Sequence, residues 1–239
     1  MFVRRLVRKL GYVIVGLSDV GKRAAPDERA AALDLTGDRD IEWSWVAAHV
    51  PDNPGAVLDF GCGESALGLI AAMKGGDVTG FDRQQVRRPY GSPNLRLETG
   101  DILNSDFTDK HFDVIINCSS IEHVGLAGRY GSTDAADGDL IAMERLRRVL
   151  KAPGGTMILT VPVGKDSVFK PLHRVYGVRR LKLLLGGYTV VKKEFWSKRS
   201  SLPVWTQVSE GEAVDVQPSE SFYALGLFVL RPDVSALDA

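Results

Sequence analysis

Two glycines one residue apart, Gly61 and Gly63, follow a short apolar run that contains a carboxylate. The run is Ala56-Val57-Leu58-Asp59-Phe60, and a segment of helical composition follows the glycines at 65–73. This order predicts a strand, a tight turn and a helix. Glycines are favoured in such a turn because a Cβ would hold a ligand away from the backbone N–H groups at the start of the helix. The stretch predicts a nucleotide-binding turn, although the glycine spacing alone does not choose the nucleotide.

Carboxylates also close the strands that are expected next. An apolar run at 77–81 ends in Asp82, which lies 21 residues after Gly61. That is about the spacing at which an acidic side chain binds both ribose hydroxyls of a nucleoside. A third strand is expected at 95–99, directly before a turn that contains Asp101. The chain therefore places acids where a doubly wound sheet would hold a nucleoside.

A fourth strand is expected at 112–117, and the chain then shows four motifs in order: LDFGCG, GFD, GDI and FDVIINCSSIEHV. This series resembles the successive motifs of class I S-adenosylmethionine-dependent methyltransferases, over roughly residues 42–162. Four motifs together are more specific than any one of them. The resemblance implies an α/β fold, a Rossmann-like three-layer sandwich with a seven-stranded, mostly parallel sheet whose last strand is antiparallel. It also implies S-adenosyl-L-methionine as the cofactor.

In that family the glycine turn lies under the methionine part of the cofactor. The acid that ends the second strand binds the ribose, and the acid after the third strand meets the adenine amine. The expected cofactor-binding residues lie at the ends of the first four strands: Asp59, Gly61, Gly63, Asp82, Asp101, Ile102 and Ser119. The alternative for these motifs is a Rossmann-like dehydrogenase or a nucleotide-binding domain without activity.

The segment after the fourth strand predicts the catalytic residues. A methyl group on a sulfonium needs little activation, but a sugar hydroxyl is too weak an acid to ionise at neutral pH, so a base or a metal is expected for a carbohydrate acceptor. His123 is the candidate base, and Glu122 would orient it or contact the cofactor. A structural role for His123 at the strand end is the alternative. His173 is the second candidate base.

Three segments are expected to form substrate loops above the carboxyl ends of the strands: 125–139, 162–180 and 196–221. With the SSIEHV motif, the segments GRYG and HRVYG resemble a methyltransferase subgroup associated with sugar and polysaccharide biosynthesis. The candidate substrate-binding residues come from these two segments: Arg129, Tyr130, Arg174 and Tyr176. The leading hypothesis is O-methylation of a sugar or glycoside hydroxyl. The alternatives are a small lipid-like or quinone-type acceptor, or a non-catalytic cofactor-binding module in a glycan-assembly complex.

Asp134, Asp137 and Asp139 form a D-x-x-D-x-D pattern within the first of these loops. Oxygen ligands so close together are typical of a Mg²⁺ site, and such an ion would acidify adjacent sugar hydroxyls. Capping of the helix that is expected from about residue 140 explains one or two of these acids without a metal. Capping is the favoured interpretation.

Composition limits the class of protein. A chain of 239 residues fits one domain with extensions, and its 30 basic and 30 acidic residues cancel. The balance gives no reason to expect a nucleic-acid partner, since binding of a phosphate backbone usually leaves a basic surplus. The two cysteines, Cys62 and Cys118, are not in a C-x-x-C pattern. A reducing, cytoplasmic location is therefore expected, and zinc is not indicated.

We expect a helical extension at 1–50, followed by a methyltransferase domain at 51–239. In residues 1–20, apolar side chains recur at helical spacing opposite a basic face, and the apolar run is too short for a signal peptide or a membrane span. This helix would pack on the domain as a lid or homodimer element, or lie on an anionic membrane as a peripheral contact. Packing is favoured. Trp43 and Trp45 cannot both face the core of one helix. One of them would cap the cofactor or substrate pocket, or pack between the extension and the sheet, and packing is the favoured role.

Overall fold

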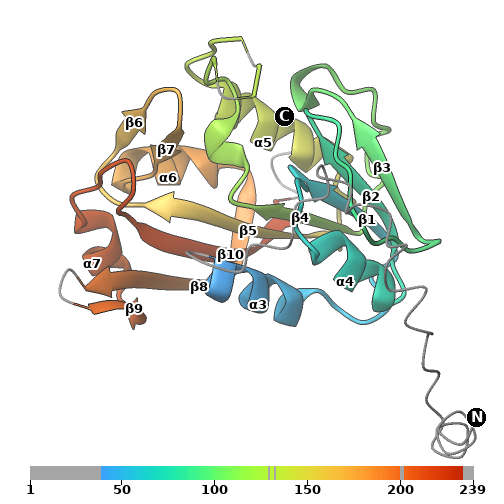
Figure 1. Ribbon diagram of the computed structural model, residues 1–239, viewed down its shortest axis with the longest axis horizontal. Coiled ribbons are helices and arrows are strands. Elements are labelled where there is room, and N and C mark those ends of the chain that lie inside the picture. Colours follow the sequence, from blue (N-terminus) through green and yellow to red (C-terminus); the bar gives the residue numbers. More distant parts are fainter. Residues whose placement is uncertain (1–38, 129, 132, 200–201, 234–239) are drawn as a thin grey trace, which may run out of the picture.

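The computed structural model describes residues 39–128, 130–131, 133–199 and 202–233 (Figure 1). The predictions for residues 1–38, including the basic helix at 1–20, lie outside the described residues. The main sheet contains β1 (Ala56–Phe60), β2 (Asp77–Asp82), β3 (Leu95–Thr99), β4 (Val114–Cys118), β5 (Thr156–Val163), β8 (Tyr188–Arg199), β9 (Leu202–Val208) and β10 (Ala224–Pro232). Its strand order is β3-β2-β1-β4-β5-β10-β8-β9.

The first five strands of this sheet are parallel to one another, and β10 is antiparallel to both of its neighbours, β5 and β8. The predicted Rossmann-like α/β sheet, mostly parallel with an antiparallel last strand, is confirmed. The strand count differs, because eight strands form where seven were expected. The additional strand is β9, which pairs antiparallel with β8. β9 contains Pro203, and it is an edge strand, where a missing backbone N–H is tolerated.

The described helices are α3 (Arg39–His49), α4 (Leu67–Met73), α5 (Gly138–Val149), α6 (Val178–Leu184) and α7 (Glu210–Asp215). Two single 3₁₀ turns, η1 (Ile102–Asn104) and η2 (Ile121–His123), follow β3 and β4. Two short strands, β6 (Ser167–Phe169) and β7 (His173–Val175), pair as a separate hairpin. In the view of Figure 1, α3 and α4 lie below the main sheet, and α5 lies above it.

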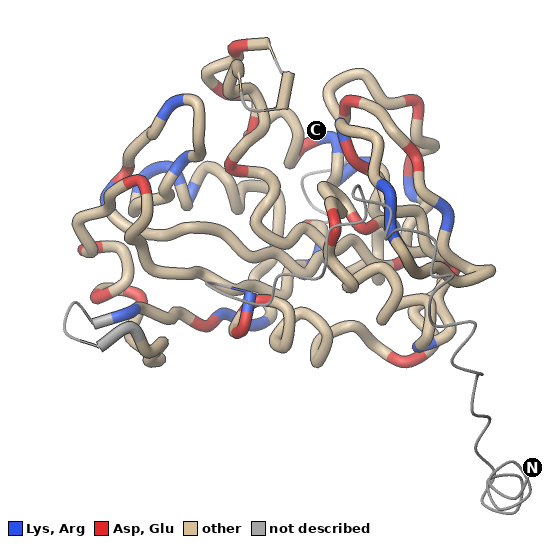
Figure 2. The backbone as a smooth tube through the Cα atoms, in the orientation of Figure 1, with Lys and Arg blue, Asp and Glu red and all other residues tan. Residues whose placement is uncertain are grey.

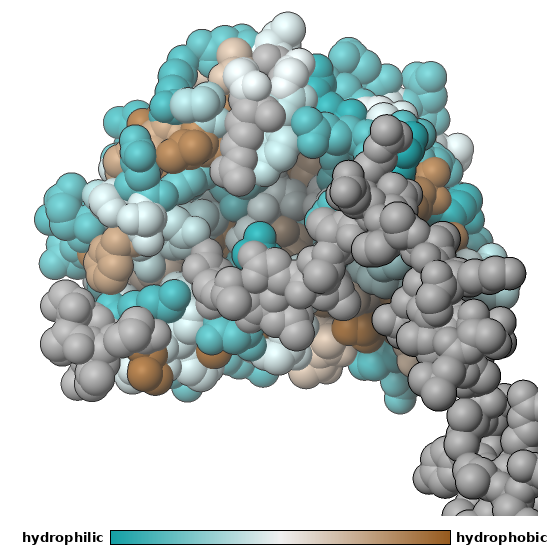
Figure 3. Space-filling view, viewed as in Figure 1, coloured by the Kyte–Doolittle hydropathy of each residue, from teal (hydrophilic) through white to brown (hydrophobic). Residues whose placement is uncertain are grey.

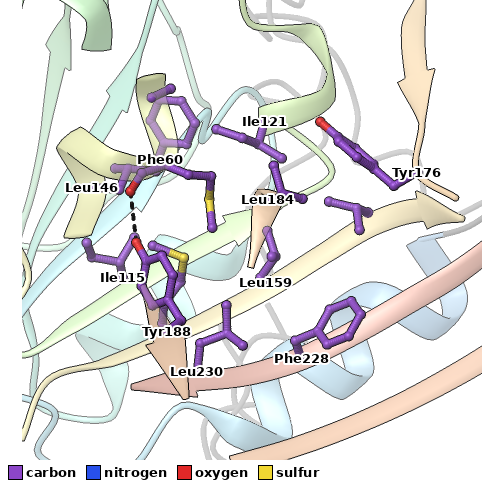
Figure 4. Close-up of a cluster of buried hydrophobic side chains, with 14 of the residues drawn as sticks. Phe60, Ile115, Ile121, Leu146, Leu159, Tyr176, Leu184, Tyr188, Phe228 and Leu230 are labelled. Carbon is purple, nitrogen blue, oxygen red and sulfur yellow. Dashed lines mark hydrogen bonds between the residues drawn. The ribbon is translucent and has the colours of Figure 1, made fainter. Parts of the chain in front are cut away.

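Each face of the sheet has its own apolar core. Val57 packs in the cluster that contains residues of α3 and α4, whereas its neighbour Leu58 packs in the cluster that contains residues of α5 and α6. Successive side chains of a strand point to opposite faces, so a strand covered on both faces is apolar throughout. Figure 4 shows the second cluster, in which the Tyr188 hydroxyl donates a hydrogen bond to the Met143 carbonyl at 2.9 Å. The central strands are thereby fixed between two helical layers.

The predicted boundary at residue 50 stays a prediction. Helix α3, on the amino-terminal side of that boundary, contacts α4, β4 and β5, and its Val46 is fully buried. In the part of the chain that the structure describes, no helix has the length and apolar character needed to cross a bilayer.

Charged residues of both signs are interspersed along the described chain (Figure 2), in keeping with their equal numbers in the sequence. The face seen in Figure 3 is mostly hydrophilic, with separate apolar side chains. Val178 and Leu183 on α6 are among the large apolar side chains that are exposed.

Candidate active site

A cavity of about 710 Å³ lies beside the carboxyl ends of β1, β2 and β4. This volume is within the range of sites that enclose a small molecule. The structure places ten of the residues predicted from the sequence on its wall: Gly61, Gly63, Asp82, Asp101, Ile102, Ser119, Glu122, His123, Tyr130 and His173. They come from segments far apart in the chain, and the parallel strands bring them together because their carboxyl ends share one edge of the sheet.

The glycine turn after β1 has the geometry that glycine allows. Gly61 and Gly63 have φ angles of +65° and +43°. A Cβ on Gly61 would lie 2.3 Å from the Ser120 Oγ, so the turn can approach the segment after β4 only without a side chain. The Gly61 N–H donates to the Phe81 carbonyl at 2.8 Å, which ties the turn to the end of β2.

Asp82 connects the glycine turn to the end of β2. Its Oδ2 accepts a hydrogen bond from the Gly63 N–H at 2.9 Å, and its Oδ1 accepts one from the Gln84 N–H at 2.8 Å. Arg88 holds the other side of the turn by donating to the carbonyls of Cys62 and Gly63, at 3.0 and 2.8 Å. These contacts hold the Asp82 carboxylate in place on the cavity wall.

Asp101 caps η1 and forms an ion pair at the same time. Its Oδ1 accepts a hydrogen bond from the Leu103 N–H at 3.0 Å, and its Oδ2 pairs with the Arg83 guanidinium. Arg83 also donates to the carbonyls of Tyr130 and Gly131, at 3.1 and 2.7 Å. Sequence reasoning missed Arg83, which follows directly after the acid that ends β2. This arginine connects the turn after β3 to the predicted substrate loop at 125–139.

His123 lies in η2 with one ring nitrogen held by the backbone. Its Nδ1 is 2.6 Å from the Leu172 carbonyl, and a carbonyl can only accept, so Nδ1 carries a proton. The Nε2 of the neutral ring is then the acceptor, and it lies 3.7 Å from the Glu122 Oε1. Glu122 is 2% exposed and lines the cavity. The pair can therefore take up a proton on Nε2 beside a carboxylate.

Aromatic rings surround this histidine. The ring of Tyr130 lies edge-on to His123 at 5.2 Å between centroids, and His173 lies edge-on at 6.5 Å. His173 comes from β7 and packs against Tyr223 at 5.2 Å. The two candidate bases, 50 residues apart in the sequence, thus share one wall of the cavity.

Comparisons with known proteins give partial matches in sequence. The family described as Caenorhabditis protein of unknown function, DUF268, matches residues 101–218. An inferred methyltransferase of Encephalitozoon cuniculi (strain GB-M1) is 33% identical over 105 residues, which make up 44% of this chain and 44% of the relative. The match thus spans less than half of the curated relative's length.

Similarity to solved structures extends further along the chain. The 4+2 cyclase SpnF has a TM-score of 0.59 at 17% identity, over 97% of this chain and 95% of that chain. The 1,6-didemethyltoxoflavin-N1-methyltransferase of Burkholderia thailandensis has a TM-score of 0.55 at 18% identity, over 80% of this chain and 76% of that chain. A methyltransferase from Mesorhizobium loti has a TM-score of 0.54 at 14% identity, over 80% of this chain and 97% of that chain. The chain has the class I methyltransferase fold. Because a cyclase has a similar fold, the fold alone does not determine the activity.

In this methyltransferase fold Asp59 lies behind the glycine turn, and it is not among the residues that line the cavity. Its side chain is 2% exposed, and burial raises the pKa of its carboxyl from 3.8 to about 6, against the opposing effect of the Arg88 guanidinium. A Cβ on Gly68 would lie 2.8 Å from the Asp59 Oδ2. The start of α4 can therefore approach this carboxylate only through a glycine.

Two of the predicted substrate-binding residues also point away from the cavity. Arg174 is 1% exposed, and it donates to four backbone carbonyls, including those of Val124 at 2.6 Å and Ala135 at 3.1 Å. The Tyr176 hydroxyl donates to the Asp139 Oδ2 at 3.1 Å. Both side chains brace the loop at 122–139 from behind. Arg129 lies outside the described residues.

The three acids of the D-x-x-D-x-D pattern are bound by cations of the chain. Asp134 pairs with Lys170 at 2.6 Å and Asp137 with Arg180 at 3.2 Å, while Asp139 is buried against the same Arg180 guanidinium. Asp137 occupies the N-cap position of α5, although its side chain makes no capping hydrogen bond there. Within the described ranges, no group of three or more His, Cys, Asp or Glu residues is placed to hold a metal ion.

Helix α3 contributes residues that sequence reasoning did not include among the site residues. Arg39, Glu42 and Trp43 line the cavity, whereas Trp45 is buried in the core. The spacing of the two tryptophans was the available signal, because it puts them on different sides of one helix. Nothing in the sequence pattern distinguished Glu42 from a surface carboxylate.

Proposed function

We propose that this protein transfers a methyl group from S-adenosylmethionine to a hydroxyl of a sugar or glycoside. The observation that carries the proposal is the orientation of His123. Its Nδ1–H is held by the Leu172 carbonyl, so the lone pair of the neutral ring is on Nε2, on a side chain that lines the cavity. A base held in this way suits an acceptor that must lose a proton.

The cavity wall fits the proposed cofactor. The positive φ angles of Gly61 and Gly63 form a turn without side chains, and Asp82 and Asp101 lie on the same wall. Asp82 would hold the ribose hydroxyls, and Asp101 with the backbone of Ile102 would hold the adenine, as in the family that the motifs resemble. When bound, S-adenosylmethionine supplies a methyl group on a sulfonium, so the protein need not activate the donor.

The remaining task for the protein is to deprotonate and position the acceptor. His123 would take the hydroxyl proton on Nε2, and the Glu122 carboxylate at 3.7 Å would stabilise the resulting imidazolium. A base in this role contributes typically about 10²- to 10⁴-fold to the rate. His173, on the same wall, is the second candidate for the base.

The aromatic side chains of the cavity wall support an acceptor that contains a ring. Trp43, Tyr130 and Tyr223 line the cavity together with the two histidines. Such walls suit the apolar faces of a sugar ring, and the resemblance of the GRYG and HRVYG segments favours a carbohydrate. They would equally suit a planar, quinone-type acceptor, which is the second candidate. The similar Burkholderia thailandensis enzyme is named as an N1-methyltransferase of 1,6-didemethyltoxoflavin, an acceptor that is not a sugar.

A transfer assay with radioactive methyl-labelled S-adenosylmethionine tests the proposal. Sugars and glycosides, quinones and lipids, and protein extracts would be offered in parallel. Methylation of a carbohydrate hydroxyl is expected. Transfer to a quinone or lipid alone would favour the second candidate, and cofactor binding without transfer would favour a non-catalytic module.

The role of His123 has its own test. His123→Ala should lower kcat by about 100-fold or more while calorimetry shows unchanged cofactor affinity. His111→Ala is the matched control, since His111 is not among the residues that line the cavity. An active His123→Ala variant beside an inactive His173→Ala variant would move the base to β7. Loss of activity with a chelator would instead direct attention to Mg²⁺ at Asp134, Asp137 and Asp139.

Homodimerisation, a cytoplasmic location and a peripheral membrane contact through residues 1–20 also remain proposals. Deletion of 1–20 separates two of the possible roles of that segment. Loss of sedimentation with anionic liposomes would indicate a membrane contact, whereas a raised KM without that loss would indicate a lid.

A further inference from the structure

Glu42 is a buried carboxylate at the cavity wall that comes from helix α3. It is 3% exposed, and its Oε1 accepts hydrogen bonds from two hydroxyls, the Ser119 Oγ and the Thr160 Oγ1, the latter at 2.6 Å. Ser119 follows β4, and Thr160 lies in β5. One side chain from before the first strand therefore joins the residue that follows β4 to the interior of the neighbouring strand β5.

Ser119 has an unusual backbone conformation. Its φ angle is +44°, a region that residues other than glycine rarely adopt. Its N–H is 3.1 Å from both the carbonyl oxygen and the Oγ1 of Thr160. A residue in this region is stable only when its surroundings hold it there, and such residues are frequent at active sites. The contacts to Thr160 and Glu42 are the ones that hold Ser119.

The bend at Ser119 determines where the next turn lies. Ser120 follows, and its Oγ donates to the carbonyls of Gly61 and Cys118, at 3.1 and 3.0 Å. The turn η2, with Glu122 and His123, begins immediately after it. A change of φ at Ser119 would rotate this turn relative to the cavity. The position of the candidate base therefore depends on a strained residue two positions before η2.

We propose that Glu42 is a positioning residue, which orients His123 by holding the bend at Ser119 through its hydroxyl hydrogen bonds. This inference rests on the proposed function, because it assigns His123 the role of base. Glu42 need not touch the acceptor. Its effect on turnover would pass through the backbone of residues 119–123.

The chemistry of the contact defines the test variants. Glu42→Gln keeps a carbonyl oxygen that can accept from both hydroxyls, whereas Glu42→Ala removes the acceptor. Ser119→Gly makes the positive φ angle accessible without support from a hydrogen bond. Ser119→Ala removes the hydroxyl from the other side of the contact. Asp40→Ala is the matched control, a carboxylate on the same helix that is exposed and does not line the cavity.

Steady-state kinetics and calorimetry on these variants would separate positioning from other roles. Glu42→Ala should lower kcat by about 10-fold or more, within the range of an impaired general base, while the Kd for S-adenosylmethionine changes by less than about threefold. Ser119→Ala should lower kcat by a similar factor. Glu42→Gln should recover most of the activity. In the Ser119→Gly background, Glu42→Ala should lower kcat by less than about threefold. If Glu42→Ala lowers kcat in the Ser119→Gly background as much as it does in the wild-type background, Glu42 acts on a ligand directly and the proposal is refuted. An unchanged kcat in the single variant Glu42→Ala would also overturn the proposal.

A ligand-free measurement distinguishes failure of this inference from failure of the proposed function. Long-range ¹H–¹⁵N NMR of the histidine rings reports the His123 tautomer and its environment. Glu42→Ala should shift the His123 signals, and the added Ser119→Gly substitution should restore them. If these signals do not respond, the positioning role is refuted even in an active enzyme. If they respond in a protein that transfers no methyl group, the positioning holds and the proposed function fails.

Discussion

Replacing Asp59 with asparagine should stabilise the protein at neutral pH. Burial is the main reason that the pKa of Asp59 is raised from 3.8 to about 6, and the Arg88 guanidinium and the Gly68 N–H offset this only in part. The folded protein therefore carries a buried charge at Asp59 above about pH 6. Asp59→Asn removes that charge and retains a carbonyl oxygen of similar shape.

The size of the effect follows from the two pKa values. The difference between 3.8 and about 6 corresponds to a free energy on the order of 3 kcal/mol. Since the folded-state pKa is the higher one, protonation stabilises the folded protein. The contribution of Asp59 to stability is fully present below pH 3.8, and it is lost as the pH rises through about 6. Above about pH 6, the free energy of unfolding of Asp59→Asn should therefore exceed that of the wild type by up to about 3 kcal/mol. Below pH 3.8 the two values should be equal.

Urea denaturation at about pH 8 and about pH 4 measures this difference. Asp113→Asn is a control of opposite sign: burial raises the pKa of Asp113, but hydrogen bonds from Lys151 and the Ala56 N–H outweigh burial and lower it. That variant should lose stability at the higher pH. An Asp59→Asn variant that is no more stable at about pH 8, or equally more stable at both pH values, would refute the reasoning. Because Asp59 does not line the cavity, cofactor affinity should persist, and its loss in a stable variant would show direct binding.

Three further substitutions test the cavity wall. Asp82→Ala should weaken S-adenosylmethionine binding by about 2–4 kcal/mol in calorimetry, since a charge-assisted contact is lost, and unchanged affinity would remove Asp82 from the site. His123→Ala should abolish the acidic limb of the pH–rate profile, whereas an unchanged profile would mean that another group is the base. Gly61→Ala should destabilise the fold by more than about 1 kcal/mol, because of its positive φ and its Cβ contact with Ser120. Adding Ser120→Gly should recover the part that is due to overlap, which thermal unfolding can measure.

The cavity's glycine turn and strand-end acids could be predicted because their signals are local. The segments predicted to form β1 to β4 agree with the structure to within two residues, and those of β1, β2 and β4 are mostly apolar. The Gly61 and Gly63 turn and the acids Asp82 and Asp101 follow directly from those segments. A strand buried on both faces has to be apolar, and the residue at its carboxyl end is then placed at the edge of the sheet.

The direction of the loop side chains was decided by tertiary structure. His173 and Arg174 are neighbours in β7, where successive side chains point to opposite sides, and only the packing of the hairpin determined that the histidine lines the cavity. The buried arginine instead satisfies backbone carbonyls of a loop about 40–50 residues away in sequence. Neither choice is encoded in the local pattern of these residues.

The contact made by Glu42, on the amino-terminal side of the site, was likewise not visible in the sequence. Glu42 precedes Ser119 by 77 residues and Thr160 by 118, and the helical pattern of α3 does not show what its polar side chains meet. Helix periodicity determines which residues share a face, but not which strand ends that face will cover. Only the docking of α3 against β4 and β5 placed this glutamate as a buried contact at the cavity wall.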